Sequence, residues 1–186
     1  MTDNKRIEMN TPEGRAMFVH LREARKIDPS NENEKAKYSM SLVFDKAAQQ
    51  TTEFQRMKAA VEKVADTKWG EMPKKLKSPF ITVEDLEKVP DGMGDDDIMV
   101  RLNSTTKPQV VDRNVDEIID DSQLYSGMYA LSNVQCYAWE HKQGGKGVSF
   151  GLGPVQKTRD GEPLGAAPKP AKDAFAALPE EDDDLL

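Results

Sequence analysis

The chain has 186 residues, 37% hydrophobic and 32% charged, which favours one globular domain with polar ends. It holds no apolar run long enough to cross a bilayer and no secretory signal, which argues against a membrane or secreted protein. The net charge is −7, but five of the 33 acids stand in the last seven positions, and the other 28 nearly balance 26 bases. The single cysteine, Cys136, excludes an internal disulfide and is typical of a reducing cytoplasm.

Two strands are predicted in the N-terminal part of the chain. Residues 1–13 are polar and are expected to form a flexible N-terminus. Residues 14–21 alternate in the manner of a strand, and a charged loop follows them. Residues 38–44 place Tyr38, Met40, Leu42 and Phe44 at every second position, which is the clearest strand pattern in this half.

One amphipathic helix is predicted after the second strand. Asp45 can cap a helix, and Gly70 stands where the helix ends. The apolar residues between them recur at helical spacing, at Phe54, Met57, Val61, Val64, Ala65 and Trp69. This stripe predicts packing against the core, and base stacking by Trp69 is the minor alternative.

The middle of the chain is less regular. Residues 71–97 are rich in proline, glycine and charge and predict a long excursion with one short element at 81–86. Residues 98–104 alternate as a third strand, with Arg101 and Asn103 opposite its apolar face. A short edge strand is expected at 108–111, and one helical turn around residues 115–119.

The most informative stretch is a predicted hairpin of two long strands, 128–140 and 147–156, joined by a glycine-rich turn. Tyr129, Tyr137 and Trp139 are even numbers of residues apart, so they share one face of their strand. Exposed aromatic rings beside lysines can stack unpaired bases and neutralise phosphates. An equally good interpretation buries Tyr137 and Trp139 in the core and turns the opposite face outward.

These elements predict an all-β fold: a five-stranded Greek-key barrel of the oligonucleotide-binding (OB) type, with one amphipathic helix between strands two and three. The predicted domain covers residues 14–157. Residues 158–186 are expected to form a flexible linker rich in Pro, Ala and Lys and a disordered acidic tail.

Catalytic and metal-binding patterns are weak. Asp95, Asp96 and Asp97 are adjacent, as are Asp120 and Asp121, and adjacent residues on an extended chain point in opposite directions. The two histidines, His20 and His141, are far apart, and the glycine-rich turn joins two strands and does not open a helix. We therefore expect no enzyme, cofactor or metal, with a magnesium-dependent nuclease at the aspartate clusters as a minor alternative.

Two groups of residues are predicted to bind partners. The predicted DNA-binding residues are Arg101, Lys107, Tyr129, Tyr137, Trp139, Lys142 and Lys146. The predicted protein-binding tail is Glu180, Glu181, Asp182, Asp183, Asp184, Leu185 and Leu186. A tail of this kind can dock a basic partner or compete with nucleic acid for a basic face. If the domain binds no nucleic acid, the chain is a protein-interaction module that acts through this tail.

Several stretches of the chain resemble the phage single-stranded DNA-binding proteins related to that of bacteriophage T-seven. The most specific is Tyr125-Ser-Gly-Met-Tyr129 followed by Gly147-Val-Ser and Val155-Gln156. The others are Gly14-Arg15-Ala16, residues 38–46, residues 108–112, residues 150–152, residues 160–162 and the acidic end. One departure is that relatives commonly end in an aromatic residue, whereas this chain ends in two leucines.

The resemblance implies an OB barrel that coats single-stranded DNA in phage replication and recombination, in the cytoplasm of the infected cell. It implies an acidic tail that recruits replication proteins such as a polymerase or a helicase-primase. The same resemblance supports the aromatic and basic residues named above as the DNA-binding set. Oligomeric state, with a homodimer as one option, and a preference for DNA over RNA are left open by the sequence.

Overall fold

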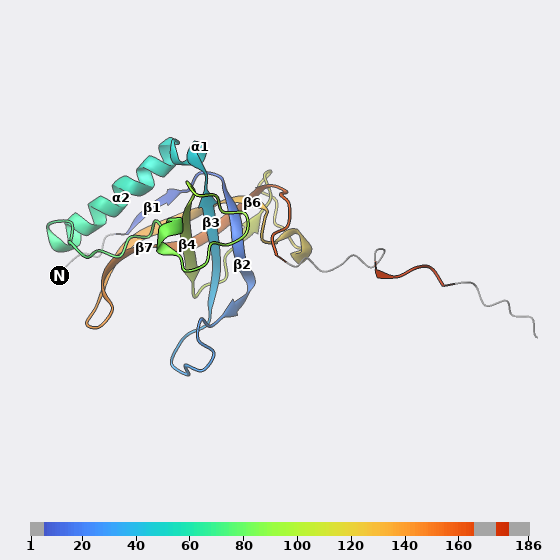
Figure 1. The fold of residues 1–186 in the computed structure, drawn as a ribbon, viewed down its shortest axis with the longest axis horizontal. Helices are drawn as coiled ribbons and strands as arrows, with labels where there is room; N and C mark the ends of the chain where they lie inside the picture. Colours follow the sequence, from blue (N-terminus) through green and yellow to red (C-terminus); the bar gives the residue numbers. More distant parts are fainter. Residues whose placement is uncertain (1–5, 166–173, 179–186) are drawn as a thin grey trace, which may run out of the picture.

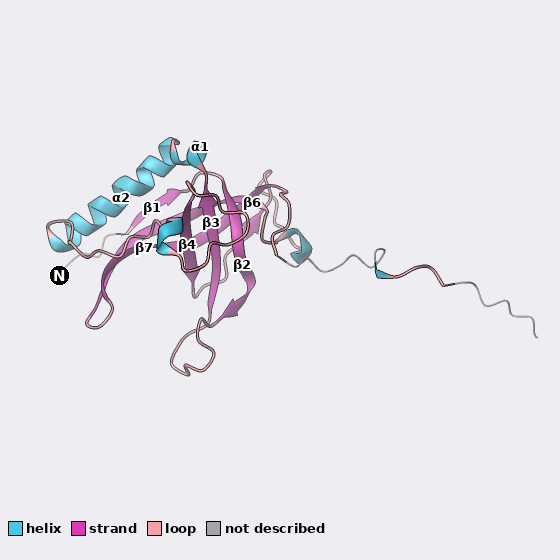
Figure 2. Ribbon diagram, in the orientation of Figure 1, coloured by secondary structure: helices cyan, strands magenta, loops and turns pink. Residues whose placement is uncertain are grey.

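The computed structural model describes residues 6–165 and 174–178, and the predicted tail residues 180–186 lie outside these ranges. Strands dominate the fold, with one long helix beside them (Figures 1 and 2). The strands are β1 (Ile7–Asn10), β2 (Gly14–Arg25), β3 (Lys37–Phe44), β4 (Ile98–Ser104), β5 (Val110–Val111), β6 (Tyr129–His141) and β7 (Gly145–Arg159). The helices are α1 (Lys46–Gln49) and α2 (Thr52–Trp69), with 3-10 turns η1 (Val83–Asp85) and η2 (Asp121–Gln123).

Five of the strands pair in a closed circuit. β6 pairs with β2, β2 with β3, and β3 with β4, all antiparallel. β4 then runs parallel to β7, and β7 pairs antiparallel with β6 along nearly its whole length. The short strands β1 and β5 attach to β6 and β7 respectively. The circuit encloses the main core, because alternate residues on each strand point inward.

Helix α2 forms where the apolar stripe predicts it. Thr51 caps its first turn by accepting a hydrogen bond from the Phe54 amide, and Gly70 ends it with a left-handed φ of 75°. Its buried stripe packs on the main core, where Phe54 contacts Phe44 and Phe80, with ring centroids 5.6 and 5.5 Å away. No helix in residues 6–165 or 174–178 is long and apolar enough to span a membrane.

The expected flexible N-terminus is wrong for residues 7–10, because they form strand β1. Ile7 and Met9 alternate with polar residues, and their side chains pack on the main core while the backbone pairs with residues 133–136 of β6. Alternation over four residues is too short a signal to distinguish such an edge strand from a polar end. The two apolar residues acquire their partners only when β6 is in place.

The domain also extends beyond the expected boundary at residue 157. β7 continues to Arg159, and Leu164 packs on a small outer cluster with Met17 and Met99. Tyr125 and Lys157 fix this segment through Asp160, whose Oδ1 lies 2.9 Å from the Tyr125 hydroxyl and 2.6 Å from Lys157 Nζ. These contacts, the Lys157 hydrogen bond above all, lower the pKa of Asp160. Residues 158–164 are therefore part of the folded domain.

The outer cluster explains what the long excursion does. Met17, Val43 and Met99 point away from the main core, and they are covered by Met93 and by apolar residues of the 81–97 segment. Ile81 pairs with Met99 through two backbone hydrogen bonds of 2.8 Å. The short element expected at 81–86 is present as η1. The helical turn expected around residues 115–119 does not form, so that prediction is wrong. The 3-10 turn η2 forms at Asp121–Gln123 instead, after Asp120 caps it.

Candidate nucleic-acid interface

The two faces of β6 differ sharply in burial. Val134, Cys136 and Ala138 are buried in the main core, whereas Tyr137 and Trp139 are only partly buried and point outward. The interpretation that buries Tyr137 and Trp139 in the core is therefore wrong. The small residues face inward because β6 crosses the enclosed core, where Phe150 of β7 and the stripe of α2 already fill the space.

Trp139 is held flat against its neighbouring strand. Its ring lies where a side chain at Gly147 would stand, so only glycine leaves room for it. Its indole N–H donates to Ser149 Oγ at 2.9 Å, and the His141 ring lies 5.2 Å away between centroids. Lys77 places its ammonium 5.9 Å from the ring centroid. The ring is thus oriented before any ligand arrives, which reduces the entropy lost on binding.

Tyr137 is the neighbouring aromatic on the same face. The guanidinium of Arg6 lies 5.3 Å from its ring centroid and donates to Gln135 Oε1 at 3.2 Å. Gln135 pairs across the ladder with Gly151 of β7, so no side chain stands beside Tyr137 at that position. Both aromatic rings therefore combine a partly open surface with a cation at one side.

A floor of small side chains continues from these rings across β7, β4 and β3. The register aligns Gln135 with Gly151, Gly151 with Asn103, and Asn103 with Ser39. We call this surface the small-residue floor, and its members are Ser39, Ser41, Asn103, Ser149, Gly151 and Gly153. Arg101 is exposed on β4 at the same face, between Ser41 and the position of Ser149. A flat ligand can approach such a floor closely because few side-chain atoms project from it.

The two predicted lysines of the β6–β7 hairpin lie outside the face that carries Trp139. Lys142 is exposed in the β6–β7 turn, and Lys146 places its ammonium 5.5 Å from the ring centroid of Trp69. Trp69 packs on the main core and donates its indole N–H to Glu140, so core packing is its main role. Figure 1 shows the β6–β7 hairpin, which carries these lysines, extending well beyond the rest of the sheet.

Sequence reasoning did not select Lys77, which the fold brings beside Trp139. The Lys77 amide donates to the Lys146 carbonyl at 2.9 Å, and the Lys77 carbonyl accepts from the Val148 amide at 3.2 Å. This single parallel bridge joins the excursion after α2 to the end of the hairpin. The run of lysines at 74, 75 and 77 was visible in the sequence, but nothing local related it to Trp139.

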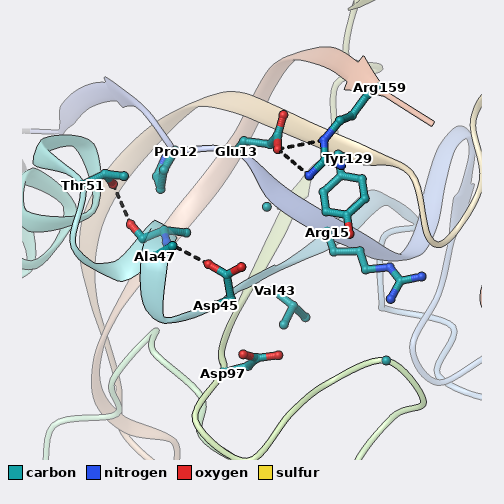
Figure 3. Close-up of a pocket in the computed structure, with 13 residues that line it drawn as sticks. Pro12, Glu13, Arg15, Val43, Asp45, Ala47, Thr51, Asp97, Tyr129 and Arg159 are labelled. Carbon is teal, nitrogen blue, oxygen red and sulfur yellow. Dashed lines mark hydrogen bonds and ion pairs between the residues drawn. The ribbon is translucent and has the colours of Figure 1, made fainter. Parts of the chain in front are cut away.

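Two predicted site residues lie elsewhere. Tyr129 is ten residues from Trp139 along β6, or roughly 33 Å at about 3.3 Å per residue. It lines a pocket of about 510 Å³, in which the Arg159 guanidinium lies 3.7 Å from its ring centroid and pairs with Glu13 at 3.1 Å (Figure 3). Lys107 lines a separate hollow with Arg22 and Glu117. The structure therefore places Tyr137, Trp139 and, two strands away, Arg101 on one face, whereas Lys146 pairs with Glu140 on the opposite face of the hairpin and Lys142 lies in its turn.

The aspartate clusters have structural partners. Asp96 pairs with Lys46 at 3.1 Å, and Asp97 accepts the Gly94 amide at 2.8 Å. Asp120 caps η2, and its hydrogen bonds from Ser122 lower its pKa. Across residues 6–165 and 174–178, no three His, Cys, Asp or Glu side chains gather as metal ligands would. Among the described residues there is thus no metal centre that would support the nuclease alternative.

Two further titratable groups are uncharged at neutral pH. Burial raises the pKa of the Cys136 thiol to about 12, so it remains protonated within the core and is a poor nucleophile. Burial, together with the charge of Arg25, lowers the pKa of His20, which pairs with Ser39 across the ladder.

Comparison with known proteins identifies one family. The model of the Enterobacter phage Enc34 ssDNA-binding protein family matches residues 7–186, which is nearly the whole chain. No curated protein sequence matches the chain.

Solved structures show the same fold at low sequence identity. A C-terminal truncation of the single-stranded DNA-binding protein from bacteriophage Enc34 is 17% identical, with a TM-score of 0.70 over 84% of this chain and 88% of that chain. The same phage protein in complex with ssDNA is 18% identical, with a TM-score of 0.70 over 85% and 89%. The gp2.5 single-stranded DNA-binding protein encoded by bacteriophage T7 is 12% identical, with a TM-score of 0.63 over 98% and 99%.

Proposed function

The chain belongs to the family of the Enterobacter phage Enc34 ssDNA-binding protein, and from this premise we propose that it coats single-stranded DNA with little regard to sequence. The observation that carries the proposal is the partly exposed pair Tyr137 and Trp139, which stand beside the small-residue floor with one cation near each ring. The bases stack on the two rings, Arg101 and Lys77 neutralise phosphates on the same face, and Lys142 does so at the hairpin turn. Each stacked base contributes about 1–3 kcal/mol, and every base has a face that can stack.

The strand circuit supports an OB barrel as the scaffold of this site. In our proposal β2, β3, β4, β6 and β7 are its five strands, with α2 between the second and third. The parallel contact between β4 and β7 supports this, because it lets the last antiparallel hairpin close against the first strand. Closure removes the free sheet edges that would otherwise pair with other chains.

The direct test is fluorescence anisotropy of a labelled poly-dT oligonucleotide, titrated with the protein at low and moderate salt with duplex DNA as competitor. We expect binding to the single strand that weakens with salt and resists the duplex competitor. A protein that binds no oligonucleotide even at low salt would contradict the proposal. The interaction module that acts through its tail would then be the better hypothesis.

Replacing Arg101 by alanine should make binding less sensitive to salt. The side chain is exposed on the floor, and neutralising one phosphate fewer on a single strand reduces the slope of log K against log salt by about 0.7. The matched control is Lys107→Ala, which removes an equal charge from a separate hollow and should leave the slope unchanged. If Arg101→Ala and Lys107→Ala gave equal slopes of log K against log salt, Arg101 would not contact the bound phosphates.

A larger side chain at Gly151 should block the floor without disturbing the fold. A Cβ at this position meets its nearest atoms at 3.7 Å, whereas at Gly153 it would collide with the Asn133 carbonyl. We expect Gly151→Val to lower oligonucleotide affinity by about 1–3 kcal/mol, the contribution of one stacked base. Gly94→Val is the control, because its Cβ also makes only ordinary contacts but lies on the excursion. Wild-type affinity for Gly151→Val, with an unchanged melting temperature, would show that DNA does not cross β7.

We extend the proposal to the biological setting: phage DNA replication and recombination inside the infected host cell. Residues 180–186 supply acidic and apolar groups suited to a basic groove of a replication protein. Deleting this tail should tighten DNA binding if the tail competes for the basic face. It should also abolish capture of a purified replication polymerase, and retained capture would contradict a role of the tail in recruitment.

A further inference from the structure

Phe18 occupies β2 in a backbone conformation that few phenylalanines adopt. Its φ is 51°, in the left-handed region, and among the described residues only Val115 shares a positive φ without being glycine. It stands in a register shift between Met17 and His20, where β2 bulges against β3. Its side chain is 53% exposed, although the neighbouring Met17 is buried. Bulges of this kind redirect a side chain, and strained positions of this kind gather at functional sites.

The redirected ring forms one wall of a groove of about 520 Å³. The base of the groove includes Ser39, Ser41, Arg101 and Asn103, which belong to the floor or stand on it. The segment between β2 and β3 also lines the groove, where Ile27 is 91% exposed. In Figure 1 this segment extends beyond the sheet in a different direction from the β6–β7 hairpin.

The charge of this groove is complementary to a polyanion. Arg25, Lys37 and Arg101 line it, and the one acidic lining residue is Glu34. The Glu34 carboxylate is already engaged, since it accepts the amides of Ile27 and Asp28 at 3.1 and 2.8 Å. Serine, asparagine and arginine side chains in the base of the groove can hydrogen-bond base edges and phosphates, and Phe18 and Ile27 add apolar surface against which a base can pack.

The groove is continuous with the aromatic end of the interface. Ser39 and Asn103 are adjacent across β3 and β4, and Asn103 is adjacent to Gly151. From β6 to β2 the path crosses four strand spacings of about 4.8 Å, or roughly 19 Å. Arg101 stands between Phe18 at one end and Tyr137 and Trp139 at the other.

We propose that Phe18 is a second base-stacking platform and that single-stranded nucleic acid runs across the strands from Trp139, over Arg101, to Phe18. This inference rests on the proposed function and adds to it the course of the strand and a residue at its far end. The bulge holds the ring out of the core so that one face is free for a base.

The test is the anisotropy titration with Phe18→Gly, Phe18→Tyr and Phe18→Leu. Glycine suits a φ of 51°, so Phe18→Gly should melt no lower than wild type while losing affinity on the order of 5- to 150-fold, the contribution of one stacked base. Phe18→Tyr keeps a ring and should bind like wild type. Phe18→Leu keeps an apolar side chain without a ring and should bind weakly.

The matched control is Val115→Gly, which changes another exposed left-handed residue outside the groove and should leave affinity unchanged. Wild-type affinity for Phe18→Gly or for Phe18→Leu would overturn the role of Phe18 while leaving DNA binding intact. Failure of the wild-type protein to bind would instead overturn the proposed function itself. If Phe18→Gly melts early, the comparison of Phe18→Tyr with Phe18→Leu decides the matter.

Discussion

The double variant Tyr137→Ala/Trp139→Ala should lose roughly 1.4 to 4.3 powers of ten in affinity for single-stranded DNA, because each of the two stacked bases contributes about 1–3 kcal/mol. The two rings stand on the outer face of β6, oriented by Gly147, Ser149 and nearby cations. They lie outside the main core, so the melting temperature should change little. Anisotropy titration and thermal melting of the same samples measure both quantities.

Tyr129→Ala is the sharpest control for this prediction. Tyr129 lies on the same strand and the same face, and periodicity alone places it in the same site. The structure instead covers its ring with Arg159, far along β6 from Trp139. We expect the affinity of Tyr129→Ala to remain within about twofold of wild type, well below the contribution of one stacked base. A loss as large as that of Trp139→Ala would show that the interface is not confined to the end that we describe.

Phe54→Ala should be the most destabilising single change considered for this protein. Phe54 is 1% exposed on α2 and belongs to a chain of aromatic contacts with Phe44, Phe80 and Phe150. Removing a buried phenylalanine costs about 3–5 kcal/mol, since the transfer free energy of the ring is forfeited and a cavity remains in its place. For a protein of this size, that corresponds to a fall in melting temperature of roughly 6–20 °C.

Urea denaturation measures this loss directly, and Phe175→Ala provides its control. Phe175 is 78% exposed, so its removal should change the free energy of unfolding by less than about 0.5 kcal/mol. If Phe54→Ala cost less than about 1 kcal/mol, the helix would not be packed on the main core as described.

Local pattern was sufficient for most secondary structure. The alternation in 38–44 and 98–104 predicted β3 and β4, and the apolar stripe from Phe54 to Trp69 predicted α2 with its glycine stop. Contacts within such elements are close in sequence, so periodicity reflects them. The pattern failed at residues 7–10, which are too short to show a reliable period, and at 115–119, where turn geometry outweighed the apolar spacing.

The candidate site was only partly accessible from sequence. Even spacing placed Tyr137 and Trp139 on one face, but the opposite face is also apolar, so periodicity could not say which one points inward. That choice depended on what β7 and α2 contribute to the enclosed volume. Phe18 gave no signal at all, because its exposure results from a bulge in the pairing of β2 with β3.

By itself, the sequence determined that this chain folds mainly as strands with one helix and that aromatic residues line one face of a long hairpin. Only the tertiary structure decided which residues meet there. Lys77 lies beside Trp139, Arg101 stands two strands from Tyr137, and Tyr129 is withdrawn beneath Arg159. The reason is physical: a strand's period of two is a local property, whereas its neighbours are set by pairings between distant segments.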